Sequence, residues 1–187
     1  MSVSMAITSA PGPENRSEQR LAETERLVIR KLTRADLPSL VELFGSLEVM
    51  RFSVTGPLAA PQVAQVLDQI LASYQESPLG LWGVIEKTEH CMIGLCGFLP
   101  RVTGEPDVWE LAYRFLPNYW GLGLGTEAAA ACRDLAVRHP TVQQIIAVIE
   151  PANTASLHVA EKIGLEFWRA THRASLPVLE YALRCGA

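Results

Sequence analysis

The amino-acid sequence lacks several features that mark particular classes of protein. No apolar run approaches the roughly 18 residues that a membrane-spanning helix requires. Charged residues make up only 19% of the 187 residues, whereas hydrophobic residues make up 49%, and disordered chains have the opposite balance. There is also no basic surplus, because 16 Lys and Arg stand against 20 Asp and Glu. These absences argue against a membrane protein, a disordered chain and a nucleic-acid-binding protein.

Metal-binding and redox motifs are also missing. No pair of cysteines has C-x-x-C spacing, and no histidine lies near them in a zinc-binding pattern. We therefore predict no metal site and expect the cysteines to be small apolar residues of a protein in the reducing cytoplasm. The four are Cys91, Cys96, Cys132 and Cys185.

The first residues of the chain differ in composition from the rest. They are rich in Ser, Pro, Gly and Glu, and they lack the basic start, apolar stretch and cleavage site of a signal peptide. We expect residues 1–22 to form a flexible tail and residues 23–187 to form one domain.

Hydrophobic periodicity in residues 23–187 alternates between the patterns of strands and of helices. Strands are predicted at 26–32, 81–86, 92–99, 108–116, 144–150, 165–171 and 178–184. Helices are predicted from a capping box at Thr33 and Asp36 to Gly45, from Pro61 to Tyr74, and at 126–138 and 154–163. Because hairpins mix with β-α-β crossovers, we expect an α/β (α+β) fold with a mixed central sheet flanked by helices.

The most informative segment is a glycine-rich turn between a predicted strand and a predicted helix. Gly121, Gly123 and Gly125 occupy alternate positions, and Thr126 follows them. Glycine allows close approach of a ligand, and free N–H groups at a helix start attract anions. The turn therefore predicts a phosphate or pyrophosphate site held by backbone amides. The alternative is a tight turn that binds nothing.

A dinucleotide-binding interpretation of the same turn competes with this one. Residues 123–128 fit G-x-G-x-x-A, and Glu150 ends a following strand about where a ribose-binding acid would lie. However, residues 117–120 separate the preceding strand from the glycines, where the fingerprint needs a strand that leads directly into them. The context therefore favours another kind of phosphate ligand.

Several separated motifs resemble those of the GNAT N-acetyltransferases. ELAYRFLPNYWGLGLGTEA at 110–128 resembles motif A of that family, in the variant typical of ribosomal-protein alanine acetyltransferases. The segments NTAS at 153–156 and EKIGL at 161–165 resemble its second motif. TERLVIR at 24–30 and IGLCGF at 93–98 also fit, so the resemblance extends over most of the chain in the right order.

The resemblance implies that the chain binds acetyl-CoA. The pyrophosphate would lie on the glycine turn, and the pantetheine arm would pair like an added strand with backbone near Tyr113 and Phe115. Asn153 and Ser156 would help to hold the arm and its sulfur, although Asn153 also fits a helix N-cap. The full set of implied cofactor-binding residues is Tyr113, Phe115, Trp120, Gly121, Leu122, Gly123, Leu124, Gly125, Thr126, Asn153 and Ser156.

For catalysis the resemblance implies direct attack of an amine on the thioester. Its catalytic candidates are Glu110, which would take a proton from the amine, and Ser156. Glu110 could instead be an exposed strand carboxylate. A backbone N–H near Phe115 would stabilise the oxyanion. Ala160 stands where many relatives have a proton-donating tyrosine.

Two positively charged side chains lie near the expected phosphate site in sequence. Leu122 stands where relatives often have Lys, so Arg133 or Lys162 could assist the backbone amides, or both could be ordinary exposed charges.

The resulting hypothesis is an acetyl-CoA-dependent N-acetyltransferase acting on a primary amine of a protein N-terminus, a peptide or a small molecule. An acyl-CoA-binding module without activity and a dinucleotide-binding oxidoreductase are the alternatives. We expect the first two helices and the last hairpin to form the acceptor pocket. Aromatic residues there would line the pocket or belong to the core: Phe52, Trp82, Trp168 and Tyr181.

Overall fold

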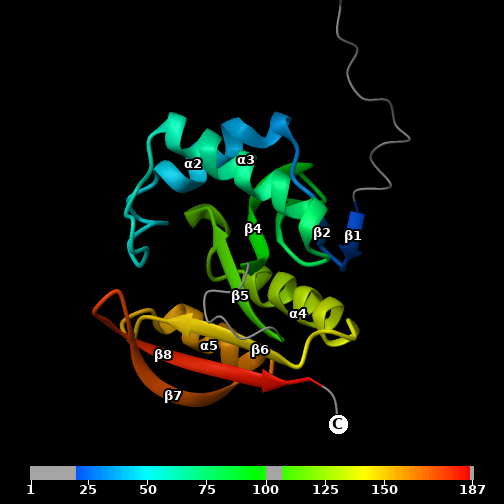
Figure 1. Ribbon diagram of the computed structural model, residues 1–187. Helices are drawn as coiled ribbons and strands as arrows, with labels where there is room; N and C mark the ends of the chain where they lie inside the picture. The colour runs from blue at the N-terminus through cyan, green and yellow to red at the C-terminus, as the bar shows by residue number, and fades with distance from the viewer. Residues whose placement is uncertain (1–19, 100–106, 186–187) are drawn as a thin grey trace, which may run out of the picture.

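The computed structural model describes residues 20–99 and 107–185, which form one eight-stranded sheet with helices on both faces (Figure 1). Its strands are β1 (Arg20–Glu23), β2 (Leu27–Arg30), β3 (Leu81–Glu86), β4 (Cys91–Leu99), β5 (Val108–Phe115), β6 (Gln144–Ile149), β7 (Glu166–Arg173) and β8 (Leu176–Arg184). Their order is β1-β2-β3-β4-β5-β6-β8-β7. Among the described strands only β5 and β6 are parallel neighbours, so the expected mixed sheet and α/β fold class are confirmed.

The helices divide between the two faces of the sheet. They are α2 (Leu37–Gly45), α3 (Ala60–Glu76), α4 (Leu124–Val137) and α5 (Thr154–Lys162), with short 3₁₀ turns η1 (Arg34–Asp36) and η2 (Pro117–Tyr119). Successive residues of β4 point to opposite faces, so Leu95 packs in the cluster of α2 and α3 while Cys96 packs in that of α4 and α5. Two apolar cores therefore sandwich the sheet.

The predicted capping box at the first helix is confirmed. The Thr33 amide donates to the Asp36 carboxylate at 2.7 Å, and the Arg30 guanidinium donates to both oxygens of the same carboxylate. This carboxylate therefore links the end of β2 to the start of α2.

The start of the ordered sheet differs from the prediction. β1 begins at Arg20, and Ala22 pairs with Ile29 of β2, so residues 20–22 belong to the sheet rather than to the expected tail. The rest of that tail, residues 1–19, lies outside the described residues. A four-residue strand at the sheet edge is too short to produce a clear alternation of polar and apolar residues.

The two parallel strands separate soon after they pair. They share only three residue pairs, from Val108 with Gln144 to Glu110 with Ile146. Beyond these pairs, β5 continues in contact with β4, and β6 continues in contact with β8. The facing edges of β5 and β6 consequently diverge in the middle of the sheet, and the candidate site occupies this opening.

Candidate active site

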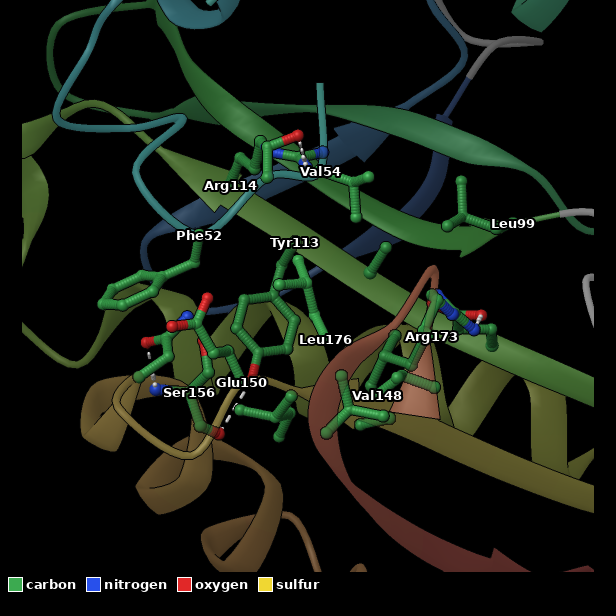
Figure 2. Close-up of a pocket in the computed structure, with 18 of the residues that line it drawn as sticks. Phe52, Val54, Leu99, Tyr113, Arg114, Val148, Glu150, Ser156, Arg173 and Leu176 are labelled. Carbon is green, nitrogen blue, oxygen red and sulfur yellow. Dashed lines mark hydrogen bonds and ion pairs between the residues drawn. The ribbon is translucent and has the colours of Figure 1, made fainter. Parts of the chain in front are cut away.

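Two adjoining cavities lie where β5 and β6 diverge. The larger, of about 440 Å³, extends to the glycine-rich turn, and we call it the glycine groove. The smaller, of about 280 Å³, is lined by four charged side chains, and we call it the charged pocket (Figure 2). Both cavities are lined by Tyr113, Asn153 and Ser156. The sequence-predicted residues that line the glycine groove are Tyr113, Phe115, Trp120, Gly121, Gly123, Gly125, Thr126, Asn153 and Ser156.

The glycine turn presents the start of α4 to the groove. Gly121 and Gly123 have φ angles of 73° and 78°, in the left-handed region that favours glycine. Gly123 is the N-cap of α4, and its carbonyl accepts the Glu127 amide at 3.0 Å. The amides of residues 124–126 precede this first helical hydrogen bond and have no helical carbonyl to bond. They are therefore available to an anion. The helix therefore starts at Leu124, two residues before its predicted start.

A hydrogen-bonded clamp from the N-terminal part of the chain holds this turn. Glu127 accepts from the Thr24 hydroxyl at 2.6 Å and from the Arg26 Nε at 2.7 Å, and Arg26 Nη1 donates to the Leu122 carbonyl at 2.9 Å. Burial acts to raise the pKa of Glu127, but these hydrogen bonds outweigh it and hold the pKa below its ordinary 4.5.

Sequence reasoning missed this clamp because 101 residues separate Arg26 from Glu127. A signal was present in the sequence: Arg26 lies within the quoted 24–30 motif, and Glu127 lies in the first turn of the helix that follows the glycines.

Contacts between β5 and α5 fix the part of the groove that adjoins the charged pocket. The Tyr113 hydroxyl donates to the Ser156 carbonyl at 3.0 Å, and the Ser156 amide donates to Asn153 Oδ1 at 3.2 Å (Figure 2). Asn153 is thus the N-cap of α5, as one interpretation of the sequence had it. Burial raises the pKa of Tyr113, so its phenol keeps its proton. Within the described residues, the Ser156 hydroxyl has no hydrogen-bond partner and is available to a ligand.

Glu110 is not the exposed strand carboxylate that one interpretation expected. It is only 6% exposed, and its two oxygens accept from the Arg173 guanidinium at 2.7 Å and 2.6 Å. The hydrogen bond with Glu110 raises the pKa of Arg173. Arg173 ends β7, and the pair, which lines the charged pocket, therefore joins β5 to the last hairpin.

A second carboxylate lines the same pocket. Glu150 directly follows β6, and its carbonyl accepts the Asn153 amide at 2.8 Å, which ties its position to the start of α5. Its side chain makes no hydrogen bond or ion pair to any residue in 20–99 or 107–185. In the view of Figure 2 it lies near Ser156 and below Phe52.

The aromatic residues expected near the acceptor site were interpreted either as pocket-lining residues or as core residues, and the structure shows some of each. Phe52 lines both cavities, as a pocket residue would. Trp82 and Tyr181 belong to the buried core, because the strands that carry them turn these side chains toward the apolar clusters. Trp168 lies on β7, is 39% exposed and lines neither cavity.

Of the remaining predicted residues, Lys162 lines the groove, whereas Leu122, Leu124 and Arg133 do not. Leu124 is buried in the core and Leu122 is 55% exposed, so only their backbone atoms belong to the turn. Arg133 pairs with the neighbouring Asp134.

Ala160 is fully buried, and its methyl group cannot donate a proton to a thiolate.

The topology contradicts the dinucleotide-binding interpretation. That fold needs a mostly parallel sheet with a strand leading directly into the glycines. Here β5 and β6 form the one parallel pair of the described sheet, and η2 separates β5 from the turn.

The described residues contain no group of three or more His, Cys, Asp or Glu side chains arranged to hold a metal ion. Their helices also include none that is both long and apolar enough to cross a membrane.

Comparison with known proteins identifies the family. The model of the acetyltransferase (GNAT) domain matches residues 26–166. YkkB of Bacillus subtilis (strain 168), an uncharacterized protein, is 33% identical over 103 residues, a match that spans 55% of this chain and 60% of YkkB. An acetyltransferase from Agrobacterium tumefaciens str. C58 superposes with a TM-score of 0.76 at 26% identity, over 98% of this chain and 99% of that one.

A more distant structure shares the fold alone. RimL, a ribosomal L7/L12 alpha-N-protein acetyltransferase in complex with coenzyme A, superposes with a TM-score of 0.75 at 15% identity, over 86% of this chain and 95% of that one. The family match extends over most of the chain, from the clamp residue Arg26 through the glycine turn to the start of β7. This chain belongs to the GNAT family and is an acetyltransferase.

Proposed function

We propose that this chain is an acetyl-CoA-dependent N-acetyltransferase that acts on a primary amine. The observation that carries the proposal is the continuous opening from the divergent edges of β5 and β6 to the start of α4. One end offers strand edges and the other offers helix-start amides, and these suit the amide-rich arm and the pyrophosphate of one ligand.

The residues of the opening fit coenzyme A in both parts. The amides of residues 121–126 would hold the pyrophosphate, with Thr126 at the helix start and Arg26 holding the turn in shape. The β5 edge around Tyr113 and Phe115 would hold the arm, and Asn153 and Ser156 would face its sulfur end. Bound acetyl-CoA would supply an activated acyl thioester.

The geometry favours Glu150 over Glu110 as the proton acceptor. Both Glu110 oxygens are engaged by Arg173, and an ion-paired carboxylate is a poor base because protonation would break the pair. Glu150 lines the same pocket and has a side chain without a hydrogen-bond partner among the described residues. We propose that Glu150 accepts the amine proton, directly or through water, and that Glu110 positions Arg173.

The Ser156 hydroxyl is our candidate for donating a proton to the departing thiolate. It is the hydroxyl near this end of the groove that no described group engages, whereas the Tyr113 hydroxyl is bonded to the Ser156 carbonyl. A backbone N–H near Phe115 would stabilise the oxyanion. Proximity of the two substrates would supply much of the remaining rate.

Calorimetric titration with acetyl-CoA and an assay of free-thiol release with a panel of amines test this proposal together. We expect binding and turnover, with kcat lowered about a hundredfold in Glu150→Gln and acetyl-CoA affinity unchanged. Absence of acetyl-CoA binding would refute the proposal. Binding without turnover of any amine would instead support the acyl-CoA-binding module, an alternative favoured by Ala160 and by the paired state of Glu110.

A further inference from the structure

The charged pocket keeps two unneutralised side chains after its internal ion pair is taken into account. Four charged residues line it: Glu110, Arg114, Glu150 and Arg173. Glu110 and Arg173 neutralise each other through two hydrogen bonds. Neither Arg114 nor Glu150 forms an ion pair with any residue in 20–99 or 107–185. A molecule entering the pocket therefore meets one positive and one negative group.

Arg114 has few partners for a guanidinium so far inside the protein. It extends from β5 toward α2, where its charged end lies 5.7 Å from the centre of the Phe44 ring. The one hydrogen bond of its side chain within the described residues is a long one, at 3.4 Å, to the Ser53 hydroxyl. A guanidinium carries five N–H donors, so most of them point to no protein acceptor among those residues. Burial lowers the pKa of Arg114, yet a guanidinium keeps its proton at neutral pH.

The two unpaired groups lie on different walls of the pocket. In the view of Figure 2, Arg114 is at the upper wall beside Val54, and Glu150 is at the lower wall beside Ser156. Apolar side chains such as Leu99 and Leu176 line the space between and around them. The lower wall adjoins Asn153 and Ser156, where the thioester end of the cofactor would lie under the proposed function.

We propose that the acceptor is an amine that also carries a carboxylate, with its amine at Glu150 and its carboxylate at Arg114. This inference rests on the proposed function and names the substrate class of the same site. A planar guanidinium fork binds a carboxylate through two parallel hydrogen bonds. One carboxylate would be neutralised by the single guanidinium, whereas a doubly charged phosphate would leave excess negative charge near Glu110 and Glu150.

Arg114 also lines the glycine groove, but the charge of the cofactor does not account for it. The glycine turn would bind the phosphates of coenzyme A at the other end of the groove, and the arm that would pass β5 is uncharged. Polycationic acceptors fit the pocket poorly, because they would place further positive charge beside Arg114. The carboxylate could belong to a free amino acid or to an acidic residue next to the N-terminus of a peptide.

The test compares acceptors that differ only in the carboxylate. Free serine and serinamide form one arm, and C-terminally amidated peptides beginning Ser-Asp or Ser-Asn form the other, with spermidine as the polycation. We expect the wild-type protein to acetylate the carboxylate member of at least one arm with a kcat/KM about ten- to a hundredfold above its amide counterpart. Which arm responds identifies the source of the carboxylate.

Two variants connect this preference to one side chain. Arg114→Met should remove the preference by lowering kcat/KM for the carboxylate acceptor, whereas Arg114→Lys should keep part of it. The Kd of acetyl-CoA should be the same in both variants as in wild type. Calorimetric binding of the N-acetylated carboxylate product should weaken in Arg114→Met, which gives a measurement independent of turnover.

Two results would overturn the inference while leaving the proposed function standing. One is equal or better acetylation of the amide acceptors or spermidine by the wild-type protein. The other is a loss in Arg114→Met that appears equally in acetyl-CoA affinity, since Arg114 would then serve the cofactor. A wild-type protein that binds no acetyl-CoA would refute the proposed function itself. Thermal melting of both variants checks that a loss reflects the site rather than the fold.

Discussion

The guanidinium of Arg173 donates one hydrogen bond to each oxygen of Glu110, at 2.7 Å and 2.6 Å, although 63 residues separate them in sequence. Glu110 belongs to β5, and Arg173 ends the strand that opens the last hairpin. The pair therefore connects the two parts of the sheet on either side of the opening. Bidentate pairs of this kind fix orientation as well as distance.

Removing one member of this pair should cost more than removing both. Arg173→Met leaves the Glu110 carboxylate buried without a partner, and we expect it to lower the free energy of unfolding by about 3 kcal/mol. The double variant Glu110→Gln with Arg173→Met should lose less, because no buried charge remains. Urea unfolding of the wild type, both single variants and the double variant measures the coupling. Strictly additive losses would contradict it.

The glycine turn offers a matched pair of substitutions. Gly123 and Gly164 have φ angles of 78° and 83°, and an added Cβ would meet nothing closer than 3.6 Å at either position. Alanine should therefore cost about 1 kcal/mol of stability at both, through backbone conformation alone. Only Gly123→Ala should also weaken acetyl-CoA binding, by about tenfold, because Gly123 shapes the turn that presents the amides. Equal calorimetric affinities of the two variants would argue against a cofactor site there.

The clamp at Glu127 predicts a pH dependence of definite sign. Its pKa is lowered in the folded protein, so the stability it contributes is present above about pH 4.5 and is lost as pH falls through the folded pKa. Glu127→Gln should lower the melting temperature by about 2–4 °C at pH 7, and the difference should shrink below pH 4.5. The variant should also bind acetyl-CoA more weakly, because Arg26 would no longer be held against the Leu122 carbonyl.

Glu23→Gln is the control for this prediction. It removes the same charge from a half-exposed carboxylate that pairs with Arg20 and Lys87 and forms no hydrogen bond or ion pair with Glu127 or with residues 121–126. Its acetyl-CoA affinity should equal that of wild type. A similar loss of affinity in both variants would point to general electrostatics rather than to the clamp.

Ser156→Ala should separate catalysis from structure. The amide and carbonyl of Ser156 make its two hydrogen bonds, so the substitution removes only the unengaged hydroxyl. We expect kcat to fall about ten- to a hundredfold in steady-state assays, with little change in the KM of acetyl-CoA. Tyr113→Phe should instead keep kcat within about threefold while lowering the melting temperature, since its hydroxyl serves the Ser156 carbonyl. The opposite order of effects would transfer the acid role to Tyr113.

Local sequence patterns were sufficient to predict most of the fold. The capping box at Thr33 and the glycines before α4 each depend on residues a few positions apart, and both were identified. Strand β1 was missed because four edge residues with a mixed polar pattern carry little signal.

The partners of site residues were the part that the sequence could not predict. Glu110 was assigned as an acid on a strand, but its state depends on Arg173, and the glycine turn depends on Arg26. Both contacts join segments far apart in the chain, and a single sequence contains no information about which distant charges meet. The same limit concealed Arg114, which became informative only when the structure showed a cavity beside it and no carboxylate among the described residues within reach.

The three-pair junction between β5 and β6 has a mechanical consequence. It makes the sheet two hydrogen-bonded ribbons, β1 to β5 and β6 to β8, which are joined by a short seam and braced by the Glu110–Arg173 pair. A ligand lying along the open edges of β5 and β6 would contact both ribbons and restrict their movement relative to each other. Occupancy should therefore slow hydrogen exchange on both ribbons at once, and the bound molecule would complete the sheet that the chain leaves open.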